Sequence, residues 1–267
     1  MTFEAAQPIL RMDMSRQRID ALLVERGFAE SREKARALLM AGDVFIGDRA
    51  IVKPGTLVDS DAAIQVAKGP PFVSRGGLKL AHALDEFDIS VASKVGLDVG
   101  ASTGGFTDCL LQHGAARVYA LDVGYGQLAY QLRQNPLVVV MERVNAHYPF
   151  VLPEKVDIAT VDLSFISLEK VLPNVLEWVK ERGDIVALVK PQFEAGRKQV
   201  GKGGVVKDPV VHATVLGRFI NWTIKQGLRL GGLVPSPILG ASGNREFLIW
   251  LRKPVAKACL QPANQKE

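Results

Sequence analysis

Short apolar runs alternate with helix-like stretches along the larger, C-terminal part of the chain. The candidate strands are rich in β-branched and other apolar residues and occupy 95–100, 117–122, 137–142, 157–163 and 184–190. The candidate helices occupy about 105–113, 126–134, 167–180 and 209–226. Near-continuous apolar strands separated by helices predict an α/β fold, with a parallel sheet covered on both faces. Two further apolar segments, 227–238 and 245–253, are expected to close the chain as strands and are compatible with an antiparallel edge.

The pattern before residue 68 predicts a different, smaller α+β unit. A short amphipathic helix is expected from Ile19 to Gly27, and a second helix is expected between Ser31, as its N-cap, and Gly42. Four short strands should follow, the first two as a hairpin, at Val44–Ile46, Ala50–Val52, Thr56–Val58 and Ile64–Val66. The segment KGPPFVSRGG contains a Pro pair and a Gly pair, which suit a linker. We therefore expect a small domain at 16–67, a linker at 68–75 and a large domain at 76–254.

The composition excludes several classes of protein. Of 267 residues, 48% are hydrophobic and 23% are charged, which is typical of globular chains and excludes general disorder. The two cysteines, Cys109 and Cys259, cannot form a disulfide framework or a four-thiolate zinc site, and the histidines lack metal-ligand spacing. The sequence also lacks a transmembrane run and a signal peptide. We expect a cytoplasmic protein without a structural metal; the oligomeric state stays open.

The net charge of +5 is unevenly distributed. Basic and acidic residues balance within 1–70, so the surplus lies in 71–267. It is concentrated between Lys190 and Lys207 and again between Arg245 and Lys257. These segments indicate a basic rim that binds a polyanion such as RNA; solvated surface loops are the alternative.

A glycine-rich loop follows the first strand of the large domain. Asp98 and Gly100 begin the segment DVGASTGGF, and Asp122 ends the second strand. Such a loop lets the backbone approach a ligand, and an acid after the next strand can accept hydrogen bonds from a ribose. The loop is neither a dinucleotide fingerprint nor a P-loop, and it resembles S-adenosylmethionine sites. The alternative is a structural turn.

Four polar residues stand at special places around this loop. Asp162 and Lys190 end neighbouring apolar runs, Lys79 precedes the first strand, and Glu246 begins the last strand. Ligands of open α/β sheets bind at the carboxyl ends of the strands, so we expect these side chains to meet. Each alone is equally explained as a helix cap, an edge charge or a solvated residue.

In this order the four residues resemble the Lys-Asp-Lys-Glu tetrad of FtsJ-like ribose 2′-O-methyltransferases. The segments SRGGLKL, DVGASTGGFTD, DLSFISL, LVKPQFE, VGKGGVVKDPVVH and GASGNREFLIWL resemble the TlyA family. The segment from Arg18 to Gly55 resembles the RNA-binding domain named after ribosomal protein S4. The resemblance covers about 16–253. It implies a Rossmann-like methyltransferase fold, a mostly parallel seven-stranded sheet, preceded by the small RNA-binding domain.

The resemblance also implies a function and a set of site residues. The implied reaction is 2′-O-methylation of ribosomal RNA, as free RNA or in ribosomal subunits, at cytidine, with S-adenosyl-L-methionine as donor. The implied catalytic residues are Lys79, Asp162, Lys190 and Glu246, with Lys190 removing the proton of the 2′-hydroxyl or steering it and Lys79 lowering its pKa or contacting a phosphate. The implied cofactor residues are Asp98, Gly100, Ser102, Thr103, Gly104, Gly105, Phe106, Asp122, Asn145 and Asp162. The implied RNA-binding residues are Arg16, Arg18, Arg32, Lys34, Arg36, Arg75, Arg197, Lys198 and Lys202.

Two other functions remain open at this point. A non-catalytic RNA-binding or ribosome assembly factor would keep the fold with a broken loop or tetrad, and both look intact. A membrane-active hemolysin, a label that the family carries, would need a membrane span or a basic amphipathic helix with an extended apolar face, and the hydropathy pattern has neither. For the five basic residues of the small domain, a salt-bridged helix surface is the alternative to an RNA-binding face.

Overall fold

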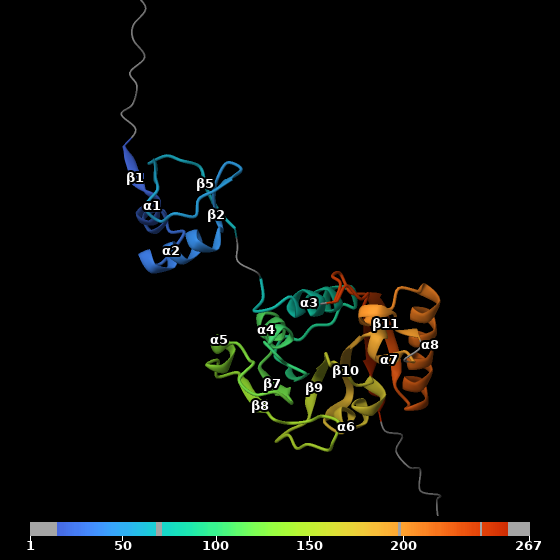
Figure 1. The fold of residues 1–267 in the computed structure, drawn as a ribbon. Helices are drawn as coiled ribbons and strands as arrows, with labels where there is room; N and C mark the ends of the chain where they lie inside the picture. Colours follow the sequence, from blue (N-terminus) through green and yellow to red (C-terminus); the bar gives the residue numbers. More distant parts are fainter. Residues whose placement is uncertain (1–14, 68–70, 197–198, 241, 256–267) are drawn as a thin grey trace, which may run out of the picture. The chain divides into compact units, whose positions relative to one another are not determined.

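The computed structural model describes residues 15–67, 71–196, 199–240 and 242–255, and the chain divides into two compact units between residues 69 and 70 (Figure 1). Each unit is described by itself. Two of the residues expected to bind RNA, Arg197 and Lys198, lie outside the described residues.

The small unit contains two helices and five short strands. The helices are α1 (Ile19–Glu25) and α2 (Arg32–Ala41). The strands are β1 (Arg16–Arg18), β2 (Val44–Ile46), β3 (Arg49–Ala50), β4 (Leu57–Asp59) and β5 (Ile64–Val66). They form the sheets β1-β4 and β3-β2-β5, and the apolar faces of both helices pack on Val44, Ile51, Val58 and Ile64. Ser31 caps α2 and Gly42 ends it with a positive φ, as expected; β1 was not expected.

The large unit is built on a seven-stranded sheet with the order β11-β12-β10-β9-β6-β7-β8. Its strands are β6 (Val95–Val99), β7 (Arg117–Asp122), β8 (Val138–Glu142), β9 (Val156–Val161), β10 (Val179–Val189), β11 (Arg229–Pro235) and β12 (Phe247–Arg252). The strands β8, β7, β6, β9 and β10 are parallel to one another, and β12 is antiparallel to both β10 and β11. The expectation of a mostly parallel sheet with an antiparallel edge is confirmed.

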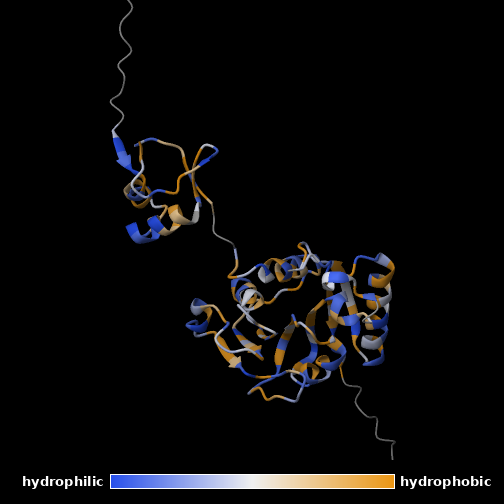
Figure 2. Ribbon diagram, viewed as in Figure 1, coloured by the Kyte–Doolittle hydropathy of each residue, from blue (hydrophilic) through white to orange (hydrophobic). Residues whose placement is uncertain are grey.

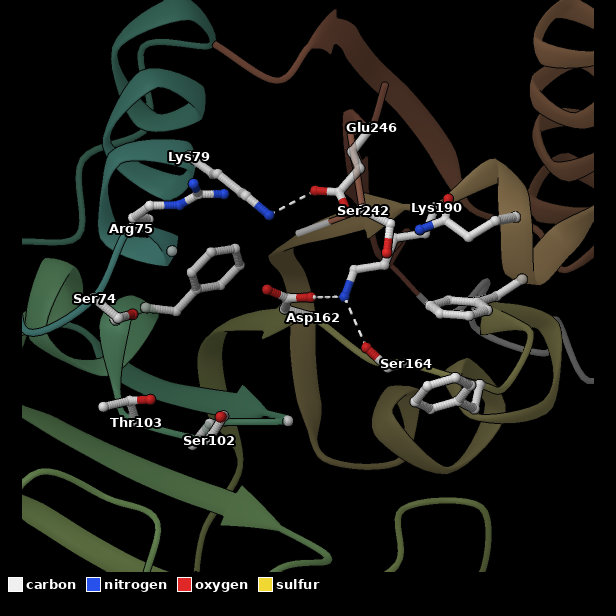
Figure 3. Close-up of a pocket in the computed structure, with 18 residues that line it drawn as sticks. Ser74, Arg75, Lys79, Ser102, Thr103, Asp162, Ser164, Lys190, Ser242 and Glu246 are labelled. Atoms are coloured by element: carbon white, nitrogen blue, oxygen red, sulfur yellow. Dashed lines mark hydrogen bonds and ion pairs between the residues drawn. The ribbon is translucent and has the colours of Figure 1, made fainter. Parts of the chain in front are cut away.

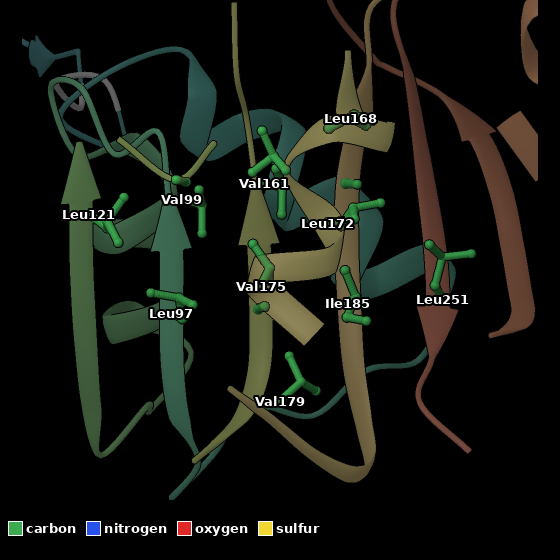
Figure 4. Packing of buried hydrophobic residues seen from close by; sticks show 14 of the residues in the cluster. Leu97, Val99, Leu121, Val161, Leu168, Leu172, Val175, Val179, Ile185 and Leu251 are labelled. Atoms are coloured by element: carbon green, nitrogen blue, oxygen red, sulfur yellow. The ribbon is translucent and has the colours of Figure 1, made fainter. Parts of the chain in front are cut away.

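Helices cover both faces of the sheet because successive strand residues point to opposite sides. On one face Leu97, Val99 and Ile185 pack with α6 (Leu172–Leu176) and α8 (Pro209–Lys225) (Figure 4). On the other face Ile158 and Val186 pack with α3 (Gly76–Glu86) and α4 (Gly105–Gln112). Figure 2 shows hydrophobic residues along the central strands and a mixture of both kinds on α8. The apolar runs of β6 and β9 are strands buried on both sides, as their composition indicated, whereas the edge strand β8 is partly exposed.

Three helical segments differ from the expectation. The helix expected at 167–180 is wrong: a 3₁₀ turn (Leu168–Lys170) leads into the short α6, and β10 begins at Val179 rather than at 184. Val179 pairs with Val156, and an irregularity before Asp184 lets the strand continue, which apolar periodicity does not reveal. The helix expected at 126–134 shrinks to α5 (Tyr130–Arg133), and α7 (Pro191–Glu194) was not expected.

The topology places the carboxyl ends of five parallel strands at one edge of the sheet. From β6 the chain runs outward to β7 and β8, and then returns to β9 and β10 on the other side of β6. Loops after β6 and β9 therefore diverge from adjacent strands, which is where open α/β sheets bind ligands.

Candidate functional site

A cavity of about 340 Å³ lies at this edge of the sheet (Figure 3). Its lining comes from five segments: the approach to α3 and its first turns, and the loops after β6, after β9, after β10 and before β12. All four residues of the expected tetrad line it, namely Lys79, Asp162, Lys190 and Glu246. The structure brings together residues that lie up to 167 positions apart in the sequence.

The four side chains form two separate ion pairs (Figure 3). Lys79 Nζ lies 2.5 Å from Glu246 Oε2, with the two side chains 10% and 4% exposed. Lys190 Nζ lies 2.6 Å from Asp162 Oδ1 and donates to Ser164 Oγ over 3.1 Å. Each lysine thus has its own carboxylate partner.

Local sequence and strand register explain this arrangement. Asp162 directly follows β9 and Lys190 directly follows β10, and these parallel strands pair Val161 with Ala187. Pro191 begins α7 and ends the strand, since proline cannot continue the ladder. Glu246 precedes β12, whose first residue Phe247 pairs with Val189 at the end of β10. The antiparallel strand therefore brings its beginning to the edge where the parallel strands end.

Two glycines of the loop after β6 are required by close contacts. Gly100 has φ +87°, and a Cβ there would lie 2.3 Å from the carbonyl oxygen of Asp162. A Cβ on Gly105 would lie 2.2 Å from Ser74 Oγ and 2.8 Å from the backbone nitrogen of Gly77. Gly100, Ser102, Thr103, Gly105 and Phe106 line the cavity, as expected for a cofactor loop. Gly104 is not among the lining residues; its absent side chain makes room for Leu132, only 2.3 Å from a Cβ.

A second, smaller cavity of about 210 Å³ is lined by Asp122 and Asn145 and shares Gly100 and Ser164 with the first. Asp122 accepts hydrogen bonds from the backbone N–H groups of Ser102, over 2.8 Å, and of Gly124, over 2.7 Å. One bond to each oxygen leaves further acceptor capacity on the carboxylate. The two expected nucleoside-side residues thus share one cavity beside the tetrad.

Asp98 does not line either of these two cavities. It is fully buried and accepts hydrogen bonds from Thr107 Oγ1, over 2.7 Å, and Thr160 Oγ1, over 3.0 Å. Burial is the main cause that raises its pKa from 3.8 to about 7, with a smaller contribution from the charge of Asp162. The expected direct contact between Asp98 and a cofactor is not supported; Asp98 instead joins β6, α4 and β9 beneath the loop.

The residues expected to bind RNA occupy several places. Arg75 lines the cavity and donates to the carbonyl oxygen of Leu239 over 3.0 Å, and Lys202 is exposed on a 3₁₀ turn (Lys202–Gly204). In the small unit each of the five basic residues has an acidic partner: Arg16 pairs with Asp59, Lys34 with Glu30, and Arg18, Arg32 and Arg36 all with Asp20. These five basic residues therefore form a salt-bridged surface, in which three of the arginines share the single carboxylate of Asp20.

The sequence reasoning missed several polar residues of the cavity. Ser164 accepts from Lys190, and Ser74, Ser242 and Gln192 also line the space. Gln192 Oε1 is buried and has no hydrogen-bond partner within the described residues. The nearness of Ser164 to Asp162 and of Gln192 to Lys190 in the sequence was the only available signal.

In the described part of the chain, no three side chains of His, Cys, Asp or Glu gather in a way that could hold a metal ion. None of the described helices combines the length and the apolar character that a membrane span requires.

Comparison with known proteins gives the same division of the chain. Residues 72–253 match the family described as FtsJ-like methyltransferase, and residues 17–64 match the S4 domain. "Putative rRNA methyltransferase YqxC" of Bacillus subtilis (strain 168) is 51% identical over 251 residues, covering 91% of this chain and 88% of that protein. "16S/23S rRNA (cytidine-2'-O)-methyltransferase TlyA" of Mycobacterium tuberculosis (strain CDC 1551 / Oshkosh) is 48% identical over 247 residues, covering 91% and 92%. A solved structure, "Putative hemolysin from Streptococcus thermophilus", is 43% identical with a TM-score of 0.68 and covers 90% of both chains.

Proposed function

This chain belongs to the FtsJ-like methyltransferase family, and we propose that it transfers a methyl group from S-adenosylmethionine to the ribose 2′-hydroxyl of a cytidine in ribosomal RNA. The similarity to the TlyA relatives spans both the large unit and the S4 domain, so it supports the substrate as well as the reaction. The resemblance seen in the sequence motifs is confirmed at the level of the family. We also propose that the chain acts in the cytoplasm, because its proposed substrate is ribosomal RNA.

The observation that carries this proposal is the pair of lysine–carboxylate contacts beside a glycine loop in one cavity. Methyl transfer to an alcohol requires that donor and acceptor be aligned and that a proton leave a weakly acidic hydroxyl. The backbone of the glycine loop is available to contact one ligand, and the two ion pairs line another part of the same cavity. A binding protein without turnover would not need one buried and one largely buried lysine side chain there, 10% and 12% exposed, since burying charges is costly.

The residues present fit S-adenosylmethionine. A Cβ at Gly100 or Gly105 would collide with backbone or with Ser74, so the loop keeps its backbone bare next to the cavity. We assign Gly100, Ser102, Thr103 and Gly105 to the methionine portion, and Asp122 and Asn145 to the nucleoside portion. When bound, the cofactor supplies an electrophilic methyl group on a sulfonium sulfur.

Lys190 is assigned the proton transfer. Nζ must first lose to solvent the proton that it holds in the ion pair; it would then accept the proton of the ribose 2′-hydroxyl, as that oxygen forms a bond to the methyl carbon and the bond from this carbon to the sulfonium sulfur breaks. Asp162 and Ser164 hold Nζ at a fixed point of the cavity, and the carboxylate stabilises the ammonium that forms. An oriented base with a carboxylate behind it follows the logic of base–orienter pairs in other enzymes.

Lys79 and Glu246 are assigned to binding and orientation of the acceptor. The Lys79 ammonium is almost buried, lines the cavity and is held by Glu246, so it presents a positive charge to a ligand without competing for Asp162. A phosphate beside the target ribose is the natural partner for that charge.

The proposal is tested by incubating the full chain with methyl-labelled S-adenosylmethionine and ribosomal RNA or ribosomal subunits. Label in the ribose of the RNA, absent when Lys190 is replaced by Ala, is the expected result. A ribosome assembly factor without turnover would bind RNA and leave it unlabelled. A membrane-active hemolysin would release dye from liposomes, which we do not expect, and dye release without labelling would overturn the proposal.

A further inference from the structure

A buried carboxylate lies beneath three arginines in the small unit. Asp20, in the first turn of α1, is 0% exposed. Arg18 donates to it through Nε, over 3.0 Å, and through Nη2, over 2.9 Å. Arg32 Nη2 and Arg36 Nε each lie 3.6 Å from one of its oxygens. We name Asp20, Arg18, Arg32 and Arg36 the Asp20 cluster.

Strand β1 and helices α1 and α2 build the cluster. Arg18 directly precedes α1, whereas Arg32 and Arg36 lie one turn apart on α2 and so share a face of that helix. The apolar sides of α1 and α2 pack together over Ile19, Leu23, Ala35 and Leu39, which brings the polar sides together at Asp20. Neither helix could form the cluster alone.

The arginines remain available to a ligand although they are ion-paired. Their side chains are 47%, 57% and 54% exposed, while the carboxylate is covered completely. A guanidinium carries five N–H donors in a planar fork, and contact with Asp20 occupies only part of them. The cluster thus buries its one negative charge and exposes its three positive charges.

The cluster also concentrates positive charge in a unit whose basic and acidic residues balance overall. Arg16 pairs with Asp59 and Lys34 pairs with Glu30, so each of these cations has a partner of its own. Three arginines around one carboxylate leave a local excess of two positive charges. The arginine side chains hold the pKa of Asp20 at about 2, the hydrogen bond from Arg18 being the largest cause, so the carboxylate stays charged at neutral pH.

We propose that Asp20 is a positioning residue for RNA binding: it holds Arg18, Arg32 and Arg36 in the arrangement that contacts RNA phosphates. Three guanidinium groups repel one another, and without a central anion they would separate, so that RNA binding would bear the entropy cost of ordering them. With it they form a prearranged fork for phosphate oxygens. The inference rests on the proposed function, since it takes ribosomal RNA as the ligand.

For Asp20→Asn, a positioning role and an effect of net charge alone predict opposite changes in RNA affinity. Asp20→Asn removes a negative charge from an RNA-binding surface, which should strengthen binding if only charge matters. If Asp20 positions the arginines, the same change weakens RNA binding by about 10-fold. It also makes the negative slope of log K against log salt shallower by about 1 to 2, because fewer phosphates are contacted.

Asp59→Asn is the matched control. It removes the same charge from the same unit, but Asp59 is 52% exposed and touches only Arg16 within the described ion pairs, at 3.6 Å. Its RNA affinity should equal that of the wild type or exceed it by up to about 3-fold. Asp20→Glu is the second variant, which keeps the charge and shifts the carboxylate by one methylene. If Asp20 positions the arginines, RNA binding weakens; if only net charge matters, RNA affinity does not change.

The measurement is a salt titration of the full chain and its variants on the ribosomal RNA that the wild type binds, with circular dichroism as a check of folding. Methylation kinetics add a second readout: the cluster lies in the small unit, so KM for RNA should rise while kcat stays close to that of the wild type. Folded Asp20→Asn and Asp20→Glu proteins that bind as tightly as Asp59→Asn, with an unchanged salt slope, would overturn the inference. Wild-type chain that methylates no RNA would overturn the proposed function instead.

Discussion

Lys190 and Asp162 form an ion pair of 2.6 Å at the ends of two neighbouring parallel strands. Because β9 and β10 are hydrogen-bonded side by side, the residue after each strand reaches the same edge of the sheet. The pair therefore lies at the carboxyl ends of both strands, in the cavity that the glycine loop also lines. The following predictions test what this arrangement does.

Replacing Lys190 with Ala should reduce kcat for methyl transfer by about 10²–10⁴-fold, the usual contribution of general acid–base catalysis. Affinity for S-adenosylmethionine, measured by calorimetry, should change little, because the assigned cofactor residues lie on other loops. Wild-type turnover by a Lys190→Ala protein would remove Lys190 from the reaction.

Breaking the Lys79–Glu246 pair from one side should destabilise the large unit by about 3–5 kcal/mol, the cost of leaving a buried charge without its partner. The double variant Lys79→Met/Glu246→Gln should recover much of this loss in a urea unfolding experiment. Both forms should be poor enzymes. Additive losses in the double variant would mean that the 2.5 Å contact contributes no coupling energy.

Gly105→Ala should weaken binding of S-adenosylmethionine by at least 10-fold, since its Cβ would lie 2.2 Å from Ser74 Oγ and force the loop away from α3. The control is Gly217→Ala on α8, where a Cβ meets nothing within 4 Å. That substitution should leave cofactor affinity unchanged and stabilise the protein by about 0.5–1 kcal/mol through helix propensity. Equal cofactor affinity in both variants would contradict the role of the loop.

Asp98 should make stability fall as pH rises toward 8. Its pKa is raised in the folded protein from 3.8 to about 7, so its favourable contribution is complete below about 3.8 and is lost as pH rises through 7. Asp98→Asn cannot ionise, and its stability relative to the wild type should increase between pH 5 and pH 8. The free energy of unfolding of both proteins is measured against pH by chemical unfolding. Parallel profiles would show that burial does not raise the pKa of Asp98.

The sequence predicted those features that depend on strand ends and periodicity. Asp162, Lys190 and Glu246 were expected to meet because they stand at the boundaries of apolar runs, and the register of the sheet brings them together. The antiparallel edge was expected from the separate final pair of strands. Such features need only the order of elements and the rule that ligands bind at carboxyl ends.

Features that depend on side-chain direction could not be predicted. Asp98 was expected in the cavity, but strand residues alternate between faces, and its carboxylate points to Thr107 and Thr160 instead. The pairing of Lys79 with Glu246 rather than with the Lys190 site, and the contact of Ser164 with Lys190, depend on packing of segments far apart in the sequence. The sharing of Asp20 by three arginines likewise requires the packed helices.

The most direct test of the account is a nucleotide-resolution map of ribose 2′-O-methylation in ribosomal RNA from cells with and without this chain. We expect at least one methylated cytidine to lose its methyl group in the absence of the chain, and to regain it when the wild type, but not Lys190→Ala, is returned. An identical methylation map in both cells would contradict the central claim.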